Sequence, residues 1–166
     1  CTFGGGNFSK EILKFSSTFV EAYDRDKQIL PKARELEKKF PKRFKFYQIK
    51  FSQIDKIIID QADIFIFDLG LSSIQLDDLS RGFSFKSKNE LNMSMGQTKR
   101  SAKEVLNTYS NKDLKEIIKI FGEEEEASKI SNNIVKERAK GKINTTDELV
   151  KIIKKSKRKN FKKKID

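Results

Sequence analysis

The feature that most constrains the fold of this chain is a short apolar run that ends in an acid and a turn. Residues 63–67, Asp-Ile-Phe-Ile-Phe, have the length and composition of a buried β-strand, and they lead into Asp68 and then Leu-Gly-Leu-Ser-Ser. In open parallel sheets, ligands bind outside the carboxyl ends of the strands. The run therefore predicts an α/β fold in which Asp68 is directed at a ligand rather than at the core.

A glycine-rich turn and a second strand-end acid strengthen this prediction. Gly4, Gly5 and Gly6 follow the apparent end of a strand and precede a helix capped by Ser9, whose free N–H groups suit a phosphate or carboxylate. Asp24 lies 20 residues after Gly4, where an acid accepts the hydroxyls of a cofactor ribose. The third glycine of the dinucleotide fingerprint is missing. The pair is compatible with either NAD or S-adenosylmethionine. The structural alternatives are a tight turn for the glycines and a helix N-cap for Asp24, although Asp26 is the stronger candidate for that cap.

Apolar spacing predicts alternating strands and helices up to residue 77. A strand is expected to end at Cys1-Thr2-Phe3, before the glycine turn. Further along, strands are expected at 18–23, 44–50 and 63–69, with helices at 9–17, 26–39 and 53–59. This β-α-β-α-β-α-β order is typical of a doubly wound parallel sheet.

After residue 77 the strand pattern ends and capped helices replace it. Ser101 with Glu104, and Thr145 with Glu148, have the spacing of helix-capping boxes. Apolar residues at helical spacing mark further helices between these two. Residues of roughly 90 to 150 therefore form a predicted helical domain, followed by a lysine-rich stretch.

Composition narrows the function classes. The 166 residues hold 36 Lys and Arg against 24 Asp and Glu, a net charge of +12, which favours a polyanionic partner such as RNA, DNA or an anionic membrane surface. One cysteine and no histidine exclude an internal disulfide, most zinc sites and every histidine-dependent triad. No apolar run is long enough to span a membrane, so a cytoplasmic location is expected. Because residue 1 is Cys and already ends a strand, we expect the chain to be part of a longer protein.

Aromatic and basic residues near the predicted site have two interpretations each. Phe51, just past a strand, suits packing on an adenine face or burial in the core. The turn Arg81–Phe85 combines a guanidinium with Phe83 and Phe85, which suits stacking on an unpaired base and holding phosphate, or closing an apolar contact between domains. Asp68 suits accepting a hydrogen bond from a substrate amine, or capping its own turn. Methyl transfer to an exocyclic amine needs only such alignment, whereas the lone Cys1 disfavours a thiolate mechanism.

Short motifs occur along the chain: Cys1-Thr2-Phe3-Gly4-Gly5-Gly6, Tyr23-Asp24-Arg25-Asp26, Asp68-Leu69-Gly70-Leu71-Ser72-Ser73, Gln75-Leu76-Asp77, Arg81-Gly82-Phe83-Ser84-Phe85, Phe121-Gly122-Glu123-Glu124 and Ile143-Asn144-Thr145-Thr146. Taken together, these motifs resemble the bacterial RsmH family, also called MraW. The resemblance covers nearly the whole chain up to about residue 155 and implies a Rossmann-like methyltransferase with a small inserted helical domain. It also implies S-adenosylmethionine as cofactor and methylation of the N4 amine of a cytidine in small-subunit (16S) ribosomal RNA, at the decoding centre.

Carried over by position, the resemblance implies a set of site residues and domains. Asp68 takes the catalytic role, and substrate RNA is expected at Arg81, Phe83 and Phe85. Residues 1–89 correspond to part of the methyltransferase domain, 90–152 to a helical substrate-recognition insertion, and 153–166 to a lysine-rich end. The expected cofactor contacts are Gly6, Asn7, Phe8, Asp24, Phe51, Asp68 and Gln75.

The chain departs from the family pattern in two places. Asn7 and Phe8 stand where Gly-His or Gly-Tyr is common, and Asn92, Ser94 and Gly96 stand where many relatives have Asp, Arg and Asp. Two other functions therefore remain open. One is a noncatalytic basic RNA-binding remnant of such an enzyme, and the other is a nicotinamide-dependent oxidoreductase, which the Gly4 to Asp24 spacing alone favours.

Overall fold

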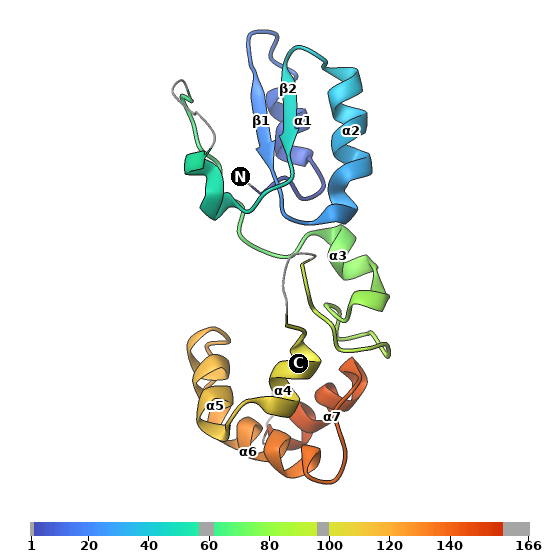
Figure 1. Ribbon diagram of the computed structural model, residues 1–166, viewed down its shortest axis with the longest axis vertical. Helices are drawn as coiled ribbons and strands as arrows, with labels where there is room; N and C mark the ends of the chain where they lie inside the picture. Colours follow the sequence, from blue (N-terminus) through green and yellow to red (C-terminus); the bar gives the residue numbers. More distant parts are fainter. Residues whose placement is uncertain (1, 57–61, 96–99, 158–166) are drawn as a thin grey trace, which may run out of the picture. The chain divides into compact units, whose positions relative to one another are not determined.

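The computed structural model describes residues 2–56, 62–95 and 100–157, and the chain divides into two compact units (Figure 1). The sheet unit comprises Cys1–Asp77 with Met95–Thr98, and the helical unit comprises Asp78–Ser94 with Lys99–Asp166. Within the described ranges, no helix has both the length and the apolar character that crossing a membrane requires.

The sheet unit is built around a β-α-β crossover. Strands β1 and β2 run parallel, with Val20 opposite Phe44 and Tyr23 opposite Tyr47. The crossover begins where the Asp26 side chain accepts a hydrogen bond from the backbone N–H of Gln28, which confirms the predicted cap. Its elements are α1 (Asn7–Ile12), β1 (Val20–Tyr23), the 3₁₀ helix η1 (Lys27–Ile29), α2 (Leu30–Lys39), β2 (Phe44–Tyr47), the 3₁₀ helix η2 (Phe51–Lys56) and α3 (Ser73–Asp77).

The two faces of this small sheet differ because successive strand residues point to opposite sides. One face forms the apolar core of the unit, made of Phe3, Leu13, Ala22, Ile29, Ala33, Leu36, Phe44 and Phe46. On the other face, the rings of Tyr23 and Tyr47 stack with centroids 5.1 Å apart, and both hydroxyls donate to the Glu21 carboxylate. Burial, and then the nearby Glu21, raise the pKa of Tyr23.

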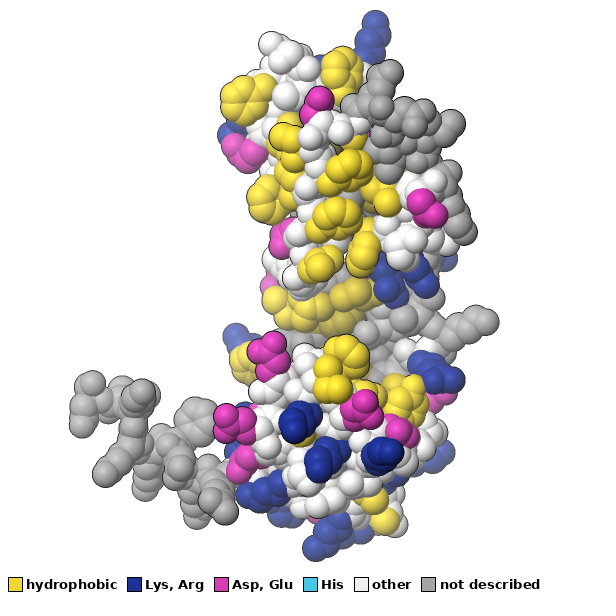
Figure 2. Space-filling model, turned by 90° about the vertical axis from the view of Figure 1, so that its left-hand side faces the viewer, with side chains coloured by type: hydrophobic (Ala, Val, Ile, Leu, Met, Phe, Trp, Pro, Cys, Tyr) yellow, Lys and Arg dark blue, Asp and Glu magenta, His cyan; other side chains and the backbone are white. Residues whose placement is uncertain are grey.

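The predicted strand at 63–69 is not formed. The described residues contain a single sheet, β1 with β2, and all residues from 62 to 71 are irregular and exposed. Residues 2–3 are likewise not a strand. β-Propensity mainly reflects packing against neighbouring strands and a core, so an apolar run without such neighbours does not become a strand. Figure 2 shows hydrophobic side chains gathered on one face of the sheet unit, whereas charged side chains mix over the helical unit.

The helical unit closes around a core of its own. The side chain of Ser101 caps α4, and Thr145 and Glu148 form the reciprocal capping box of α7, so both predicted helix starts are confirmed. Its elements are the 3₁₀ helix η3 (Leu79–Arg81), α4 (Ala102–Thr108), α5 (Asn111–Ile120), α6 (Ala127–Arg138) and α7 (Thr146–Ser156). Its core residues are Leu91, Leu106, Leu114, Ile130, Ile134, Ile143 and Ile152.

Candidate functional site

The glycine turn and the acid after β1 lie in direct contact. The backbone N–H of Gly4 donates to Asp24 Oδ2 at 2.9 Å, and the N–H of Asp26 donates to Asp24 Oδ1 at 2.9 Å. Gly4 and Gly6 have φ values of 53° and 77°, and a Cβ on Gly6 would lie only 2.6 Å from Cζ of Phe3. The turn can therefore take this path only with glycine at position 6. Each Asp24 oxygen keeps further acceptor capacity after these single bonds, which suits a ribose diol.

The turn after Asp68 lies beside the glycine turn. The backbone N–H of Asp68 donates to Thr2 Oγ1 at 2.9 Å, and a Cβ on Gly4 would lie 3.7 Å from Cβ of Ser72. The residue Asp68 is itself exposed. The two acids that the sequence singles out are therefore joined to the segment around the glycine turn in different ways. Asp24 accepts from Gly4 with its carboxylate, whereas Asp68 contacts Thr2 through its backbone N–H.

Gln75 is held inside the protein rather than at its surface. Its Nε2 donates to Asp26 Oδ2 at 2.8 Å, and its Oε1 accepts from the backbone N–H of Ser72 at 3.0 Å. The sequence predicts Asp26 only as a helix cap. No sequence signal points to the contact between Asp26 and Gln75, because the two residues are 49 positions apart.

The aromatic residues of the predicted pocket are exposed. Phe51 lies outside the core cluster, with its ring edge-on to Phe67 at a centroid distance of 5.9 Å. Asn7 and Phe8 lie exposed in the first turn of α1, which Gly6 precedes. The interpretation of Phe51 as a core residue is therefore wrong. The exposed part of its ring can still pack against another aromatic ring.

The Arg81–Phe85 turn belongs to the helical unit. The guanidinium carbon of Arg81 lies 5.1 Å from the centroid of the Phe83 ring, and its Nη2 donates to the carbonyl of Ser94 at 2.9 Å. Gly82 has a φ of 74°, and a Cβ there would lie 2.8 Å from the carbonyl oxygen of Glu90. Phe85 is 76% exposed. The turn thus combines a held guanidinium with one open aromatic ring.

The departures from the family pattern lie close to this turn. The Asn92 side chain accepts a hydrogen bond from the backbone N–H of Ser94 at 3.1 Å, and the Ser94 carbonyl accepts the Arg81 bond. Asn92 and Ser94 therefore help to shape the loop that Arg81 contacts. Gly96 lies outside the described residues.

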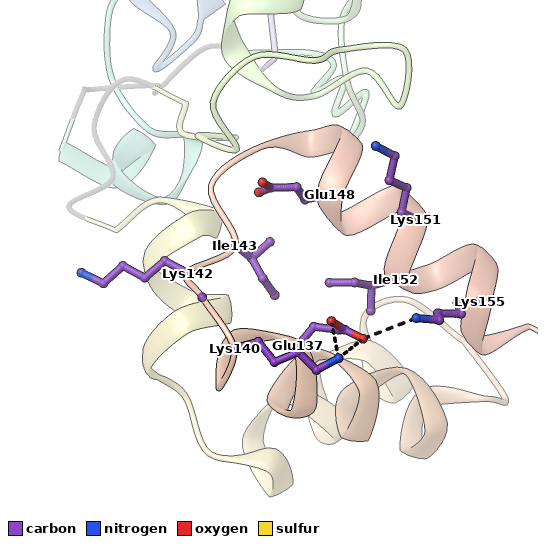
Figure 3. Close-up of a pocket in the computed structure, with 9 residues that line it drawn as sticks. Glu137, Lys140, Lys142, Ile143, Glu148, Lys151, Ile152 and Lys155 are labelled. Carbon is purple, nitrogen blue, oxygen red and sulfur yellow. Dashed lines mark hydrogen bonds and ion pairs between the residues drawn. The ribbon is translucent and has the colours of Figure 1, made fainter.

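A groove of about 400 Å³ lies between the end of α6 and α7 and is lined largely by charged side chains (Figure 3). Glu137 pairs with Lys140 at 3.0 Å and with Lys155 at 3.5 Å, and these lysines lower the pKa of Glu137. Glu148 instead accepts backbone N–H bonds at the start of α7. Lys142 points away from this ion-pair cluster in Figure 3. Glu137 is thus paired with lysines of the groove itself, and Glu148 is hydrogen-bonded to the backbone.

Charge is distributed unevenly between the two units. The helical unit contains 23 Lys and Arg against 13 Asp and Glu, whereas the sheet unit contains 13 against 11. The net charge of +12 therefore divides into +10 for the helical unit and +2 for the sheet unit. A positive field of this size attracts polyanions over several ångströms.

A glycine turn joined to an acid at the end of a strand, on an α/β scaffold, is typical of proteins that bind a nucleotide cofactor, and comparison with known families specifies the class. The model of the MraW methylase family matches residues 1–166. The chain belongs to this family of methyltransferases.

Curated relatives agree with the family. The chain is 41% identical over 155 residues to "Ribosomal RNA small subunit methyltransferase H" of Orientia tsutsugamushi (strain Ikeda), covering 92% of this chain and 50% of that protein. It is 44% identical over 155 residues to the protein of the same name from Caldicellulosiruptor saccharolyticus, covering 89% and 50%. The Rickettsia canadensis protein of that name is 37% identical over 157 residues, covering 94% and 51%. The chain spans about half the length of these relatives.

Proposed function

We propose that this chain is the cofactor-binding and RNA-recognition part of an S-adenosylmethionine-dependent methyltransferase. Its proposed substrate is 16S ribosomal RNA, methylated on the N4 amine of a cytidine at the decoding centre. The observation that carries the proposal is the contact between Gly4 and Asp24, which joins a glycine turn to a ribose-binding acid. Membership of the MraW methylase family and the names of the relatives support it.

The residues of the sheet unit suit S-adenosylmethionine. Asp24 accepts the ribose hydroxyls, the backbone of Gly6 approaches the methionine end, and the exposed Phe51 packs on the adenine. Asn7, Phe8 and Gln75 complete the set that the family resemblance implies. When bound, this cofactor supplies a methyl group on a positively charged sulfur.

The chain contributes positioning rather than a covalent intermediate. The Asp68 carboxylate and the carbonyls of its turn accept hydrogen bonds from the target amine, which holds the nitrogen in line with the methyl group. No thiolate or histidine is required for transfer to an exocyclic amine. This matches a chain that contains no histidine and a single cysteine.

The helical unit is the proposed RNA-binding part. Its net charge of +10 supplies attraction to phosphates, and Arg81 with the exposed Phe85 suits a base held out of its stack. Phe83, which lies under the Arg81 guanidinium, holds that cation in place. In this proposal residues 90–152 act as the substrate-recognition insertion and residues 153–166 add basic charge, in a cytoplasmic enzyme.

The proposed fold of the sheet unit is Rossmann-like. The N–H of Phe3 donates to the carbonyl of Tyr23 at 2.9 Å, and Thr2 accepts from Asp68. These contacts support residues 2–3 lying between β1 and the 63–69 segment, which is the strand order of a doubly wound sheet.

Calorimetry with S-adenosylmethionine tests the proposal on this chain, after circular dichroism has shown that it is folded. Asp24→Ala is expected to weaken binding about 10- to 100-fold, because hydrogen bonds to a charged group contribute about 1.5–3 kcal/mol. Glu35→Ala, which removes an exposed acid of α2, is the matched control and should leave binding unchanged. A folded chain that binds RNA but no cofactor would support the noncatalytic alternative, and tight NADH binding would support the oxidoreductase.

The catalytic step is tested in the longer protein. Asp68→Ala is expected to lower methyl transfer to small-subunit ribosomal RNA at least about 100-fold, because alignment of the amine depends on it. Activity within about twofold of the unaltered enzyme would contradict the role of Asp68.

A further inference from the structure

A buried hydrogen-bond bridge connects two loops of the candidate cofactor site. Gln75 in α3 donates to Asp26 in the loop after β1, and the two residues are 6% and 2% exposed. Burying a carboxylate is costly unless its oxygens are hydrogen-bonded. Asp26 meets this condition with one oxygen on Gln75 Nε2 and the other on the N–H of Gln28.

The other end of the Gln75 side chain holds the turn that follows Asp68. Gln75 Oε1 accepts from the N–H of Ser72, and the N–H of Gln75 donates back to Ser72 Oγ at 3.3 Å. Ser72 in turn lies against Gly4. One buried amide thus spans the turn that follows Asp68 and the loop that contains Asp24 and Asp26.

The bridge reaches Asp24 through the backbone. The N–H of Asp26 donates to Asp24 Oδ1, so the position of Asp26 fixes one of the two donors that orient the Asp24 carboxylate. A series of short contacts therefore links Asp24, Asp26, Gln75 and Ser72. A shift in the middle of the series changes the separation of the two acids that the cofactor must meet together.

We infer that Asp26 and Gln75 form a positioning pair, which sets the separation between the Asp24 loop and the Asp68 turn. The inference rests on the proposed function and adds a positioning role to the cofactor contact that the family resemblance implies for Gln75. The Oε1 atom and one amide N–H of Gln75 are hydrogen-bonded inside the protein, and the side chain is almost fully buried. A pocket that must hold two groups at once binds best when its loops are fixed in advance.

Exchanging the carboxylate at position 26 and the amide at position 75 tests this inference. Gln75→Glu alone places a second carboxylate against Asp26 with no donor between them, and Asp26→Asn alone places two amides together. In D26N/Q75E, the introduced asparagine amide donates to the introduced carboxylate. Its carbonyl oxygen still accepts from Gln28, and the second carboxylate oxygen still accepts from Ser72. The double variant keeps the net charge and reverses the direction of the hydrogen bond between residues 26 and 75.

S-adenosylmethionine affinity and melting temperature are measured for all four proteins. We expect the Gln75→Glu variant to bind at least about tenfold more weakly, and the double variant to recover to within about threefold of the unaltered chain. Losses that add without recovery in a folded double variant would overturn the pair and favour direct contact by Gln75. Recovery of melting temperature without recovery of affinity would also overturn it, because the pair would then be purely structural.

The same experiment separates this inference from the proposed function. If the unaltered, folded chain binds no S-adenosylmethionine, the proposed function fails. If it binds and the losses of affinity in the two single variants add in the double variant, only the positioning pair fails. If Gln75→Glu does not fold, the comparison of the unaltered chain with the double variant still decides. A double variant that does not fold while Gln75→Glu folds would contradict the inference, because the double variant should restore the hydrogen bond that the single variant lacks.

Discussion

The two units of the molecule differ in how they use their apolar and charged residues. Each unit buries an apolar core of its own. The helical unit carries most of the positive charge, whereas the sheet unit is nearly neutral and leaves the apolar run of residues 62–71 exposed. The candidate cofactor residues lie in the neutral unit, where they depend on short-range hydrogen bonds. The positive charge that we propose to attract RNA lies in the other unit, where it acts at longer range. Cofactor binding and RNA attraction should therefore respond to different substitutions.

The largest expected difference concerns apolar burial. Leu114 in the helical core is 1% exposed and Leu69 in the sheet unit is 69% exposed. Leu114→Ala is expected to lower the free energy of unfolding by about 2–5 kcal/mol, because it leaves a cavity. Leu69→Ala should change it by less than about 0.5 kcal/mol. Urea denaturation measures both, and an equal cost would mean that residues 62–71 are packed in solution.

The success of sequence-based prediction follows the same division. The capping box of Thr145 and Glu148 depends on residues three positions apart, so the sequence alone predicts the start of α7. The prediction of a strand at 63–69 is wrong, because strand formation needs a neighbouring strand that composition does not reveal. The Asp26 to Gln75 bridge joins residues 49 positions apart. Its partners can be recognised only once the loops are placed in space.

A second prediction compares one arginine from each unit. Arg43 donates to the carbonyls of Phe15 at 2.7 Å and Leu13 at 3.0 Å, whereas Arg138 donates to the carbonyl of Leu106 at 2.7 Å. Lysine keeps the charge but cannot reach several carbonyls at once. Arg43→Lys should cost about 1–2 kcal/mol of unfolding free energy, and Arg138→Lys about 0.5–1 kcal/mol. Thermal or urea denaturation measures both, and the reverse order would show that the forked arrangement adds nothing.

A third prediction tests which unit attracts RNA. Three exposed lysines of α7 and three exposed lysines of α2 provide matched triple substitutions to glutamine. For single-stranded RNA, the slope of log affinity against log salt should fall by about 0.7 for each phosphate that the protein no longer neutralises. We expect a fall of about 1–2 for the α7 set and little change for the α2 set. Fluorescence anisotropy with an RNA oligomer measures the slopes, and equal slopes would contradict the assignment of RNA to the helical unit. The sets are Lys151, Lys154 and Lys155, and Lys32, Lys38 and Lys39.

The smallest expected effects lie at opposite ends of the pH scale. In the helical unit, the backbone N–H groups of Asn144 and Thr145 hold the pKa of Glu148 below its usual 4.5. Its stabilising effect is therefore present above that pH and lost as the pH falls through the lowered pKa.

In the sheet unit, burial and Glu21 raise the pKa of Tyr23 above its usual 10.0, so its contribution is present below pH 10 and lost as the pH rises further. Urea denaturation from about pH 3 to about pH 11 should show that Glu148→Gln reduces the acid loss, by less than about 0.5 kcal/mol because the group is exposed. Tyr23→Phe should reduce only the alkaline loss. A variant that changed stability equally at both ends would show that the two groups do not act as local, independent ionisations.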